Sequence, residues 1–257
     1  MNIPPNLLNE HFQDRYFDVV NAIEEAKHIY FEGNRIFERL ALMRPQESFQ
    51  IGELGFGAGR VLVSLVDSLE RSGLEDLSIQ YNSVELHPVS HLRMKEILAV
   101  FQELVGPAIN CAVDAYSRLD ISKPGWQETE LEGTFGRITL RLWIGEALEM
   151  VQQLKKPCHA WFLDGHGPKK NPLMWRPELL NAVAQKTMKT GTVATYSVAG
   201  HVRRDLASAG FTVEKVQGFG GKNSVLRGEK NENNSTKTHP STSDCTTVET
   251  PLGFNRP

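Results

Sequence analysis

Hydrophobic and polar positions follow two alternating periods along most of this 257-residue chain. Short apolar runs typical of buried strands alternate with longer stretches whose apolar residues recur every three or four positions, as in amphipathic helices. The mixed stretch 107–136 is predicted to be a long connection with at most one short helix. The predicted strands begin at residue 49 and span 78–85, 137–144, 159–163, 191–198, 211–216 and 223–227, and the predicted helices span 61–71, 88–104, 146–154, 175–188 and 201–208.

This alternation predicts an α/β fold with a mostly parallel sheet and helices on both of its faces. The hairpin 211–227 would add one antiparallel strand at the end of the series. We predict a single domain over residues 33–228 and an N-terminal extension, 1–32, that covers one sheet edge or the mouth of the site. The segment 229–257 is rich in Asn, Ser, Thr and Pro, and it is predicted to be disordered.

Composition excludes several classes of protein. Hydrophobic residues make up 40% of the chain and charged residues 23%, as in ordinary soluble proteins. No apolar run approaches the length of a membrane span, and the polar segment 1–15 does not resemble a signal peptide. Cys111, Cys158 and Cys245 are widely spaced, which argues against a disulfide framework or a zinc site and favours the cytoplasm.

Charge is unevenly distributed along the chain. Residues 1–154 carry a net charge of −10, residues 155–230 carry +8, and the last 27 residues carry −1. A basic segment beside an acidic one suggests a polyanionic partner. Solvated surface charge is the alternative, and it is slightly favoured because charges clustered along the chain need not form a patch in space.

The stretch 49–60 combines a buried strand, a glycine loop and a helix start. Gly55, Gly57 and Gly59 permit a tight turn and a close approach of the backbone to a ligand. A dinucleotide fingerprint requires glycine at position 60, where this chain has Arg60, which disfavours a nicotinamide-dependent oxidoreductase. The spacing with Glu53 is instead the form seen in S-adenosylmethionine (SAM) methyltransferases, in which the acid can attract the ammonium of the donor. A plain strand-to-helix turn is the alternative.

Four acids stand at the ends of four successive predicted strands: Glu53, Glu85, Glu146 and Asp164. Glu85 follows Gly59 by 26 residues, a position from which a carboxylate can accept both ribose hydroxyls. Glu146, beside Gly145, could accept from an adenine amino group or could simply favour the start of a helix.

Asp164 opens a stiff loop, 164–175, that contains two glycines, two prolines and Asn171. Its His166 has no neighbours at metal-ligand spacing, so we predict a substrate contact or a plain loop position and no metal. Basic side chains at predicted carboxyl-end loops or helix starts would form a phosphate-binding rim if they converge: Lys169, Lys170, Arg203, Arg204 and Lys222.

Together these residues resemble the methyltransferase domain of the MnmC family, enzymes of tRNA 5-methylaminomethyl-2-thiouridine synthesis. The resemblance covers roughly residues 14–228. It is carried by the segments 30–34, 53–59, 83–85, 140–146, 161–165, 168–172, 174–175, 199–204, 209–211 and 218–220.

The resemblance implies a class I SAM-dependent methyltransferase with a Rossmann-like, seven-stranded sheet. It implies methyl transfer to the primary amine of 5-aminomethyl(-2-thio)uridine at the tRNA wobble position, with SAM as donor and the anticodon stem-loop as partner. The FAD-dependent oxidase domain of fused members has no counterpart here, so no FAD is predicted, and a separate oxidase is a possible supplier of the substrate. No membrane partner is predicted.

The implied cofactor residues are Glu53, Gly55, Phe56, Gly57, Gly59, Glu85, Gly145, Glu146, Asp164 and Asn34, and the implied substrate residues are His166, Lys169, Lys170, Asn171, Trp175, Arg203, Arg204, Phe219 and Lys222. Asp164 is the predicted catalytic residue, because it can orient the amine and receive its proton directly or through water. The rings of Trp175, Tyr196 and Phe219 are candidates to stack on the wobble base or to be ordinary core.

Two departures from the family pattern fall in the substrate loop: His166-Gly167 where the family has an aromatic residue and alanine, and Leu173 where it has an acid. These departures leave open an RNA-binding module that has lost catalysis. A SAM-dependent methyltransferase of small-molecule amines is a second alternative, against which the positive charge of residues 155–230 argues.

Overall fold

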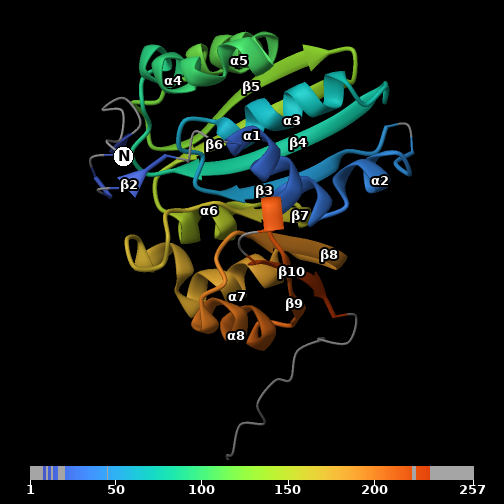
Figure 1. Cartoon of the computed structure of the whole chain (residues 1–257), viewed down its shortest axis with the longest axis vertical. Helices are drawn as coiled ribbons and strands as arrows, with labels where there is room; N and C mark the ends of the chain where they lie inside the picture. Colours follow the sequence, from blue (N-terminus) through green and yellow to red (C-terminus); the bar gives the residue numbers. More distant parts are fainter. Residues whose placement is uncertain are drawn as a thin grey trace, which may run out of the picture.

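The computed structural model describes residues 8–9, 11–12, 14–16, 21–44, 46–221 and 224–231. Its centre is an eight-stranded sheet with the order β5-β6-β4-β3-β7-β8-β10-β9, which runs from top to bottom in Figure 1. Strands β6, β4, β3, β7 and β8 are parallel, whereas β5 and β10 run antiparallel to their neighbours. The strands are β3 (Phe49–Leu54), β4 (Leu77–Glu85), β5 (Gly125–Gly133), β6 (Gly136–Ile144), β7 (Cys158–Leu163), β8 (Thr187–Thr195), β9 (Phe211–Gln217) and β10 (Ser224–Lys230).

Helices cover both faces of the sheet. One face carries α1 (Ala22–Ala26), η2 (Lys27–Glu32), α2 (Ile36–Leu40), α3 (Arg60–Glu70), α4 (His91–Leu98), η3 (Ala99–Phe101) and α5 (Gln102–Ser117). The other carries α6 (Ala147–Gln153), α7 (Pro177–Gln185) and α8 (Gly200–Ser208). Short turns η4 (Pro172–Trp175) and η5 (Phe219–Gly221) and a small ribbon of β1 (Leu8–Asn9) and β2 (Asp14–Arg15) complete the fold.

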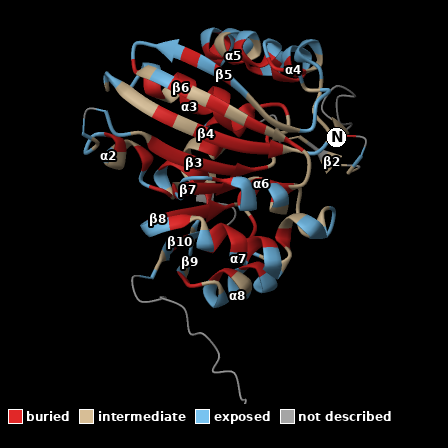
Figure 2. Cartoon of the chain, turned by 180° about the vertical axis from the view of Figure 1, so that it is seen from behind, coloured by how far each residue is buried: buried red, intermediate tan, exposed pale blue. Residues whose placement is uncertain are grey.

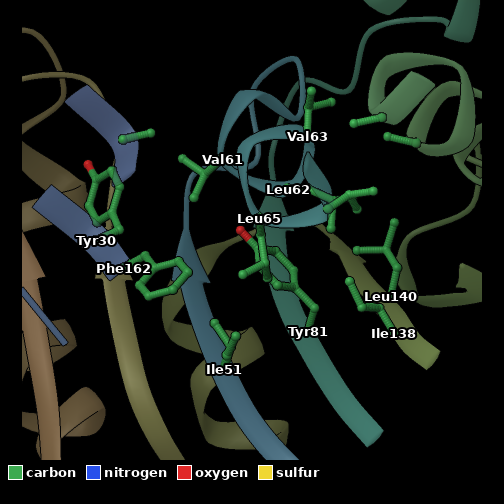
Figure 3. Packing of buried hydrophobic residues seen from close by; sticks show 14 of the residues in the cluster. Tyr30, Ile51, Val61, Leu62, Val63, Leu65, Tyr81, Ile138, Leu140 and Phe162 are labelled. Carbon is green, nitrogen blue, oxygen red and sulfur yellow. The ribbon is translucent and has the colours of Figure 1, made fainter. Parts of the chain in front are cut away.

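The central strands are buried on both sides, as Figure 2 shows. Ile51 of β3, Tyr81 of β4 and Phe162 of β7 lie side by side under α3 (Figure 3). Each large apolar side chain buried in this way contributes about 1.5–3 kcal/mol. This packing fixes the strand ends relative to one another, and therefore the loops that leave them.

The prediction for 107–136 was wrong. Helix α5 continues to Ser117 across a kink at Val105, which has φ −136° and ψ 30°. Pro107 therefore stands in the first turn after the kink, where its missing N–H costs nothing, instead of ending a helix. An additional edge strand, β5, pairs with β6, so the sheet has eight strands and not seven.

Two smaller boundaries also differ. The predicted helix 175–188 is split between η4 and α7, and Thr187 and Met188 already belong to β8.

The helical segment His91–Ser117 is long and apolar enough to cross a membrane by length and composition. In this fold its residues Ile109, Ala112 and Tyr116 pack in the core instead.

Candidate functional site

A cavity of about 400 Å³ opens at the carboxyl ends of β3, β4, β6 and β7. This volume lies within the range of small-molecule sites, which is about 300–1,000 Å³. Its walls are the loops that leave these strands, at 55–58, 84–87, 145–147 and 164–166. The position is the one expected for a ligand in an open α/β sheet.

The three glycines of the loop after β3 have different surroundings. All have positive φ, at +95° for Gly55, +57° for Gly57 and +74° for Gly59. A Cβ on Gly55 would lie 3.0 Å from Gly165 Cα, so this glycine permits close approach of two loops. A Cβ on Gly59 would meet Met94 at 2.7 Å. A Cβ on Gly57 would meet only Tyr16, at 3.5 Å, and would project from a residue that lines the cavity.

Glu85 lines the cavity beside this loop. Its Oε2 accepts from the Gly57 N–H (2.8 Å) and its Oε1 accepts from the His87 N–H (2.9 Å). Because each carboxylate oxygen can accept more than one hydrogen bond, Glu85 is held in place and still has acceptor capacity for ligand hydroxyls.

Glu146 and Gly145 also line the cavity, after β6. The Glu146 carboxylate caps α6 by accepting from the Leu148 N–H (3.0 Å). It also forms a two-pronged ion pair with Arg176, at 3.1 and 2.9 Å. The helix-start role considered for Glu146 is therefore observed, and a contact with adenine stays a prediction.

Asp164 is at the centre of a buried polar cluster. Its Oδ1 accepts from the Tyr30 hydroxyl (2.5 Å), and Arg60 Nη2 donates to both carboxylate oxygens, at 3.1 and 2.9 Å. Arg60 also donates to the Ala22 carbonyl (2.8 Å). All three side chains line the cavity.

Burial and the neighbouring Asp164 charge raise the pKa of Tyr30 well above its usual value. Burial is the largest single effect on the pKa of Arg60 and lowers it, but the charges of Asp164 and Tyr30 and the hydrogen bond to Asp164 together outweigh burial, so the net direction is upward. The tyrosine is therefore a hydrogen-bond donor and the arginine a permanent cation, and together they fix the orientation of the Asp164 carboxylate.

Three predicted cofactor residues do not line the cavity: Gly59, which is the N-cap of α3, and the buried residues Glu53 and Asn34. Glu53 is 1% exposed and faces the core, where its Oε2 accepts from the Ser83 hydroxyl (2.5 Å). Burial raises the pKa of Glu53 to about 8, against the lowering effect of the Ser83 hydrogen bond. Asn34 is fully buried, and its Nδ2 donates to the carbonyls of Tyr30 and Trp161. Neither the Glu53 nor the Asn34 side chain lines the cavity in this structure, and a contact of either one with the cofactor stays a prediction.

The loop after β7 contributes His166 and Asn171 to the cavity wall. The His166 ring lies 3.2 Å from Asn9 Nδ2 and 3.4 Å from Asp14 Oδ2, which ties the loop to the N-terminal ribbon. Trp175 is 2% exposed, packs in the core edge-on to Tyr196, and donates from Nε1 to the His166 carbonyl (2.8 Å). Its ring is therefore not available for stacking on a base, whereas Tyr196 does line the cavity.

Basic side chains among the described residues of 155–230 lie at both edges of the sheet. Lys169, Lys170, Arg203 and Arg204 are exposed on the loops and helix start at the carboxyl edge, outside the cavity wall. At the opposite edge, Lys186 and Lys230 donate to backbone carbonyls and act structurally.

Two other predicted substrate residues are not at the cavity wall. Phe219 is half-buried near His28, away from the cavity, and Lys222 lies outside the described residues.

Several residues of the cavity wall were not predicted from the sequence. Tyr30 comes from η2, a π-helical turn of the kind often found at functional sites. Arg60 was noted only as a break in a glycine pattern, although a cation at the mouth of a site rich in acids was a usable signal. The N-terminal residues Asn9, Phe12, Asp14 and Tyr16 carry no spacing signal of their own.

The cavity wall is strongly acidic. Among the described residues that line it, Arg60 is the one lysine or arginine, whereas five residues are acids: Asp14, Glu25, Glu85, Glu146 and Asp164. Carboxylates gathered around a partly enclosed cavity favour cationic ligands and disfavour phosphates.

Comparison with known proteins gives a consistent result. Residues 112–231 match the family described as S-adenosyl-L-methionine-dependent methyltransferase. The bifunctional protein MnmC of tRNA 5-methylaminomethyl-2-thiouridine biosynthesis from Stutzerimonas stutzeri is 37% identical over 220 residues, which are 86% of this chain and 32% of that protein. The protein of the same name from Chromobacterium violaceum is 36% identical over 217 residues, 84% of this chain and 32% of its own length.

The crystal structure of MNMC2 from Aquifex aeolicus superposes with a TM-score of 0.64 at 20% identity and covers 86% of this chain and 65% of that one. This likeness supports the class I SAM-dependent methyltransferase fold predicted from the sequence. The resemblance to the methyltransferase domain of the MnmC family is confirmed, and the matched family has SAM as its methyl donor. The chain spans about a third of the length of the curated relatives it matches.

Proposed function

We propose that this chain is a SAM-dependent N-methyltransferase that converts 5-aminomethyl(-2-thio)uridine at the tRNA wobble position to 5-methylaminomethyl(-2-thio)uridine. The observation that carries the proposal is the cavity at the strand ends, in which Gly57 presents bare backbone and Asp164 presents a fixed carboxylate. Support for the tRNA substrate comes from the names of the relatives, which describe biosynthesis of this modified uridine.

The electrostatics of the wall fit this chemistry. SAM carries a sulfonium and an ammonium group, and methyl transfer to an amine first produces an ammonium. These cationic groups favour anionic surroundings. The surplus of acids over Arg60 supports such ligands and opposes the pyrophosphate of a nicotinamide dinucleotide. Glu85 would accept from the ribose hydroxyls, and Glu146 with Gly145 would contact the adenine.

SAM supplies an activated methyl group. The neutral amine nitrogen of the substrate forms a bond to the methyl carbon while the carbon–sulfur bond breaks, and the resulting secondary ammonium then releases a proton. Alignment of nitrogen, carbon and sulfur can supply up to about 7–11 kcal/mol of the barrier reduction. Asp164, held by Tyr30 and Arg60, would orient the amine and accept the proton directly or through water.

The substrate reaches the cavity as part of a tRNA. Lys169, Lys170, Arg203 and Arg204 are exposed at the same edge of the sheet and would contact phosphates of the anticodon stem-loop. The aminomethyl group would be supplied by an oxidase, which in this proposal is a separate protein, and the reaction would take place in the cytoplasm without a membrane partner.

A transfer assay tests the proposal. The purified chain is incubated with methyl-labelled SAM and with tRNA that carries 5-aminomethyl-2-thiouridine, and a matched tRNA without the aminomethyl group is the control. Label in the wobble nucleoside of the first tRNA alone is the expected result. Binding of tRNA without transfer would favour an RNA-binding module, and transfer to free amines but not to tRNA would favour a small-molecule methyltransferase.

A further inference from the structure

Aromatic and imidazole rings gather at the mouth of the cavity. His11 and His87 are stacked with their centroids 4.0 Å apart and their planes at 11°. Phe12 lies 6.1 Å from His87 and 4.6 Å from His166, measured between ring centroids. Phe12, His87 and His166 line the cavity, so the rings form one connected surface on its wall.

Two exposed leucines stand at the same mouth. Leu86, which is 50% exposed, follows β4, and Leu173, which is 59% exposed, lies in η4 after β7. Strands β4 and β7 flank β3 on opposite sides, so the leucines come from either side of the glycine loop. Large apolar side chains that are left exposed beside a cavity often mark a binding surface.

We propose that Phe12 and His87 form the platform on which the target pyrimidine base stacks when it enters the cavity, with Leu86 and Leu173 as its apolar borders. This inference rests on the proposed function and assigns to its site the residues that position the base. Phe12 and His87 thus take the stacking role that the sequence suggested for Trp175 and Phe219. Trp175 is buried, and Phe219 lies outside the cavity.

Chemistry favours a base as the occupant of this surface. Every nucleobase has a π-face that stacks on aromatic and histidine rings. A uracil ring is uncharged, so the acidic wall does not repel it. The three rings and Asp164 line the same cavity, so a base stacked on the rings could extend its 5-substituent towards the carboxylate that orients the amine.

The test compares ring removal with ring exchange. The variants are Phe12→Ala, His87→Ala and His87→Phe, with His91→Ala and Leu92→Ala as controls, because His91 and Leu92 are exposed on α4 outside the cavity. The probe is a synthetic anticodon stem-loop with a fluorescent pyrimidine analogue at the wobble position, titrated in the absence of SAM. A stem-loop with 5-aminomethyluridine serves for kinetics, and thermal unfolding and SAM binding verify that each variant is folded.

Wild-type protein is expected to change the fluorescence of the analogue as the base stacks. Each alanine variant should lose this change and raise the Kd and KM for the stem-loop about 5- to 100-fold. His87→Phe should restore the fluorescence change and the Kd and KM for the stem-loop. The control variants should behave as wild type, with unchanged SAM binding. Loss in His87→Phe equal to that in His87→Ala would overturn the stacking role, as would alanine variants that bind the stem-loop normally.

The outcome also separates this inference from the function on which it rests. If wild-type protein methylates the stem-loop and the alanine variants match it, only the platform is wrong. If wild-type protein neither binds nor methylates the stem-loop, the proposed function fails and the platform fails with it.

Discussion

The neighbouring strands β3 and β7 both carry an acid at the carboxyl end, yet the two acids have different surroundings. Glu53 lies inside β3, faces α3 and is sealed from the cavity, with Ser83 as its hydrogen-bond donor. Asp164 stands one residue beyond β7, lines the cavity and is paired with Arg60. Proximity to a strand end is therefore a poor guide to function unless the direction of the side chain is known.

The alternation of side chains along a strand explains the difference. Phe49, Ile51 and Glu53 have the same parity and face the same side of β3, so Glu53 belongs to the row that packs under α3. Asp164 has left the sheet, and its side chain is free of that alternation. We infer that the buried Glu53 has a structural role and that Asp164, which lines the cavity, acts in the proposed reaction.

The largest expected effect is on Asp164. The isosteric change Asp164→Asn keeps an acceptor for Tyr30 and Arg60 but removes the charge and the proton acceptor. Methyl transfer should fall about 10²- to 10⁴-fold, while calorimetry should show that SAM still binds. Near-normal turnover would remove Asp164 from the mechanism.

The next effect concerns the cation that holds Asp164. Arg60→Met leaves a largely buried carboxylate without its partner, and loss of one member of a buried pair costs about 3–5 kcal/mol of stability. The exposed pair of Arg93 with Glu96 is the control, since Arg93→Met should cost about 0–1 kcal/mol. Urea unfolding of both variants measures the difference, and equal losses would contradict the buried pairing.

The glycine loop that joins Glu53 to the cavity gives a third comparison. Gly57→Val and Gly73→Val place the same side chain at similar φ, +57° and +71°. Each should lose about 1–2 kcal/mol of stability through backbone strain. Only Gly57→Val obstructs the cavity, because Gly57 lines it. Gly73 does not line it, and nothing lies within 4 Å of a Cβ on Gly73. SAM affinity, measured by titration, should fall about ten-fold or more for Gly57→Val alone, and equal affinities would contradict the loop assignment.

The smallest functional effect is expected at Glu53. Glu53→Gln, the counterpart of Asp164→Asn, should leave SAM affinity and turnover within a factor of about three, because the side chain does not reach the cavity. A large loss of SAM affinity would restore the role predicted from the sequence.

The same variant has a distinct pH signature. Folding raises the pKa of Glu53 from 4.5 to about 8, so the native state binds more protons than the unfolded state between these values. The contribution of Glu53 to stability is thus fully present below about pH 4.5 and is lost as pH rises towards 8. Unfolding free energies measured across this window should decline more steeply for wild type than for Glu53→Gln, and parallel curves would exclude the raised pKa.

Much of the fold was predictable because the parallel strands are apolar and bounded by glycines. Strand β5 was missed because only Thr129 and Leu131 of its nine residues are buried. Its three glutamates recur at every second position, and Glu128 pairs with Arg141 of β6 across the hairpin. That spacing was the available signal for a polar edge strand.

The site was less predictable than the fold. Glu85 and Asp164 were found because they follow the ends of parallel strands, which topology brings together. The partners Tyr30 and Arg60 meet Asp164 through contacts between residues 134 and 104 positions apart, and no local pattern encodes such contacts. The separation of the basic residues between two sheet edges likewise depends on strand direction and not on linear charge.

The most direct measurement is a crystal structure of the chain with SAM. We expect SAM in the cavity, against the backbone of Gly57, with its ribose hydroxyls on Glu85 and its methyl group directed towards Asp164. A donor bound elsewhere, or one whose methyl group points away from Asp164, would contradict this expectation.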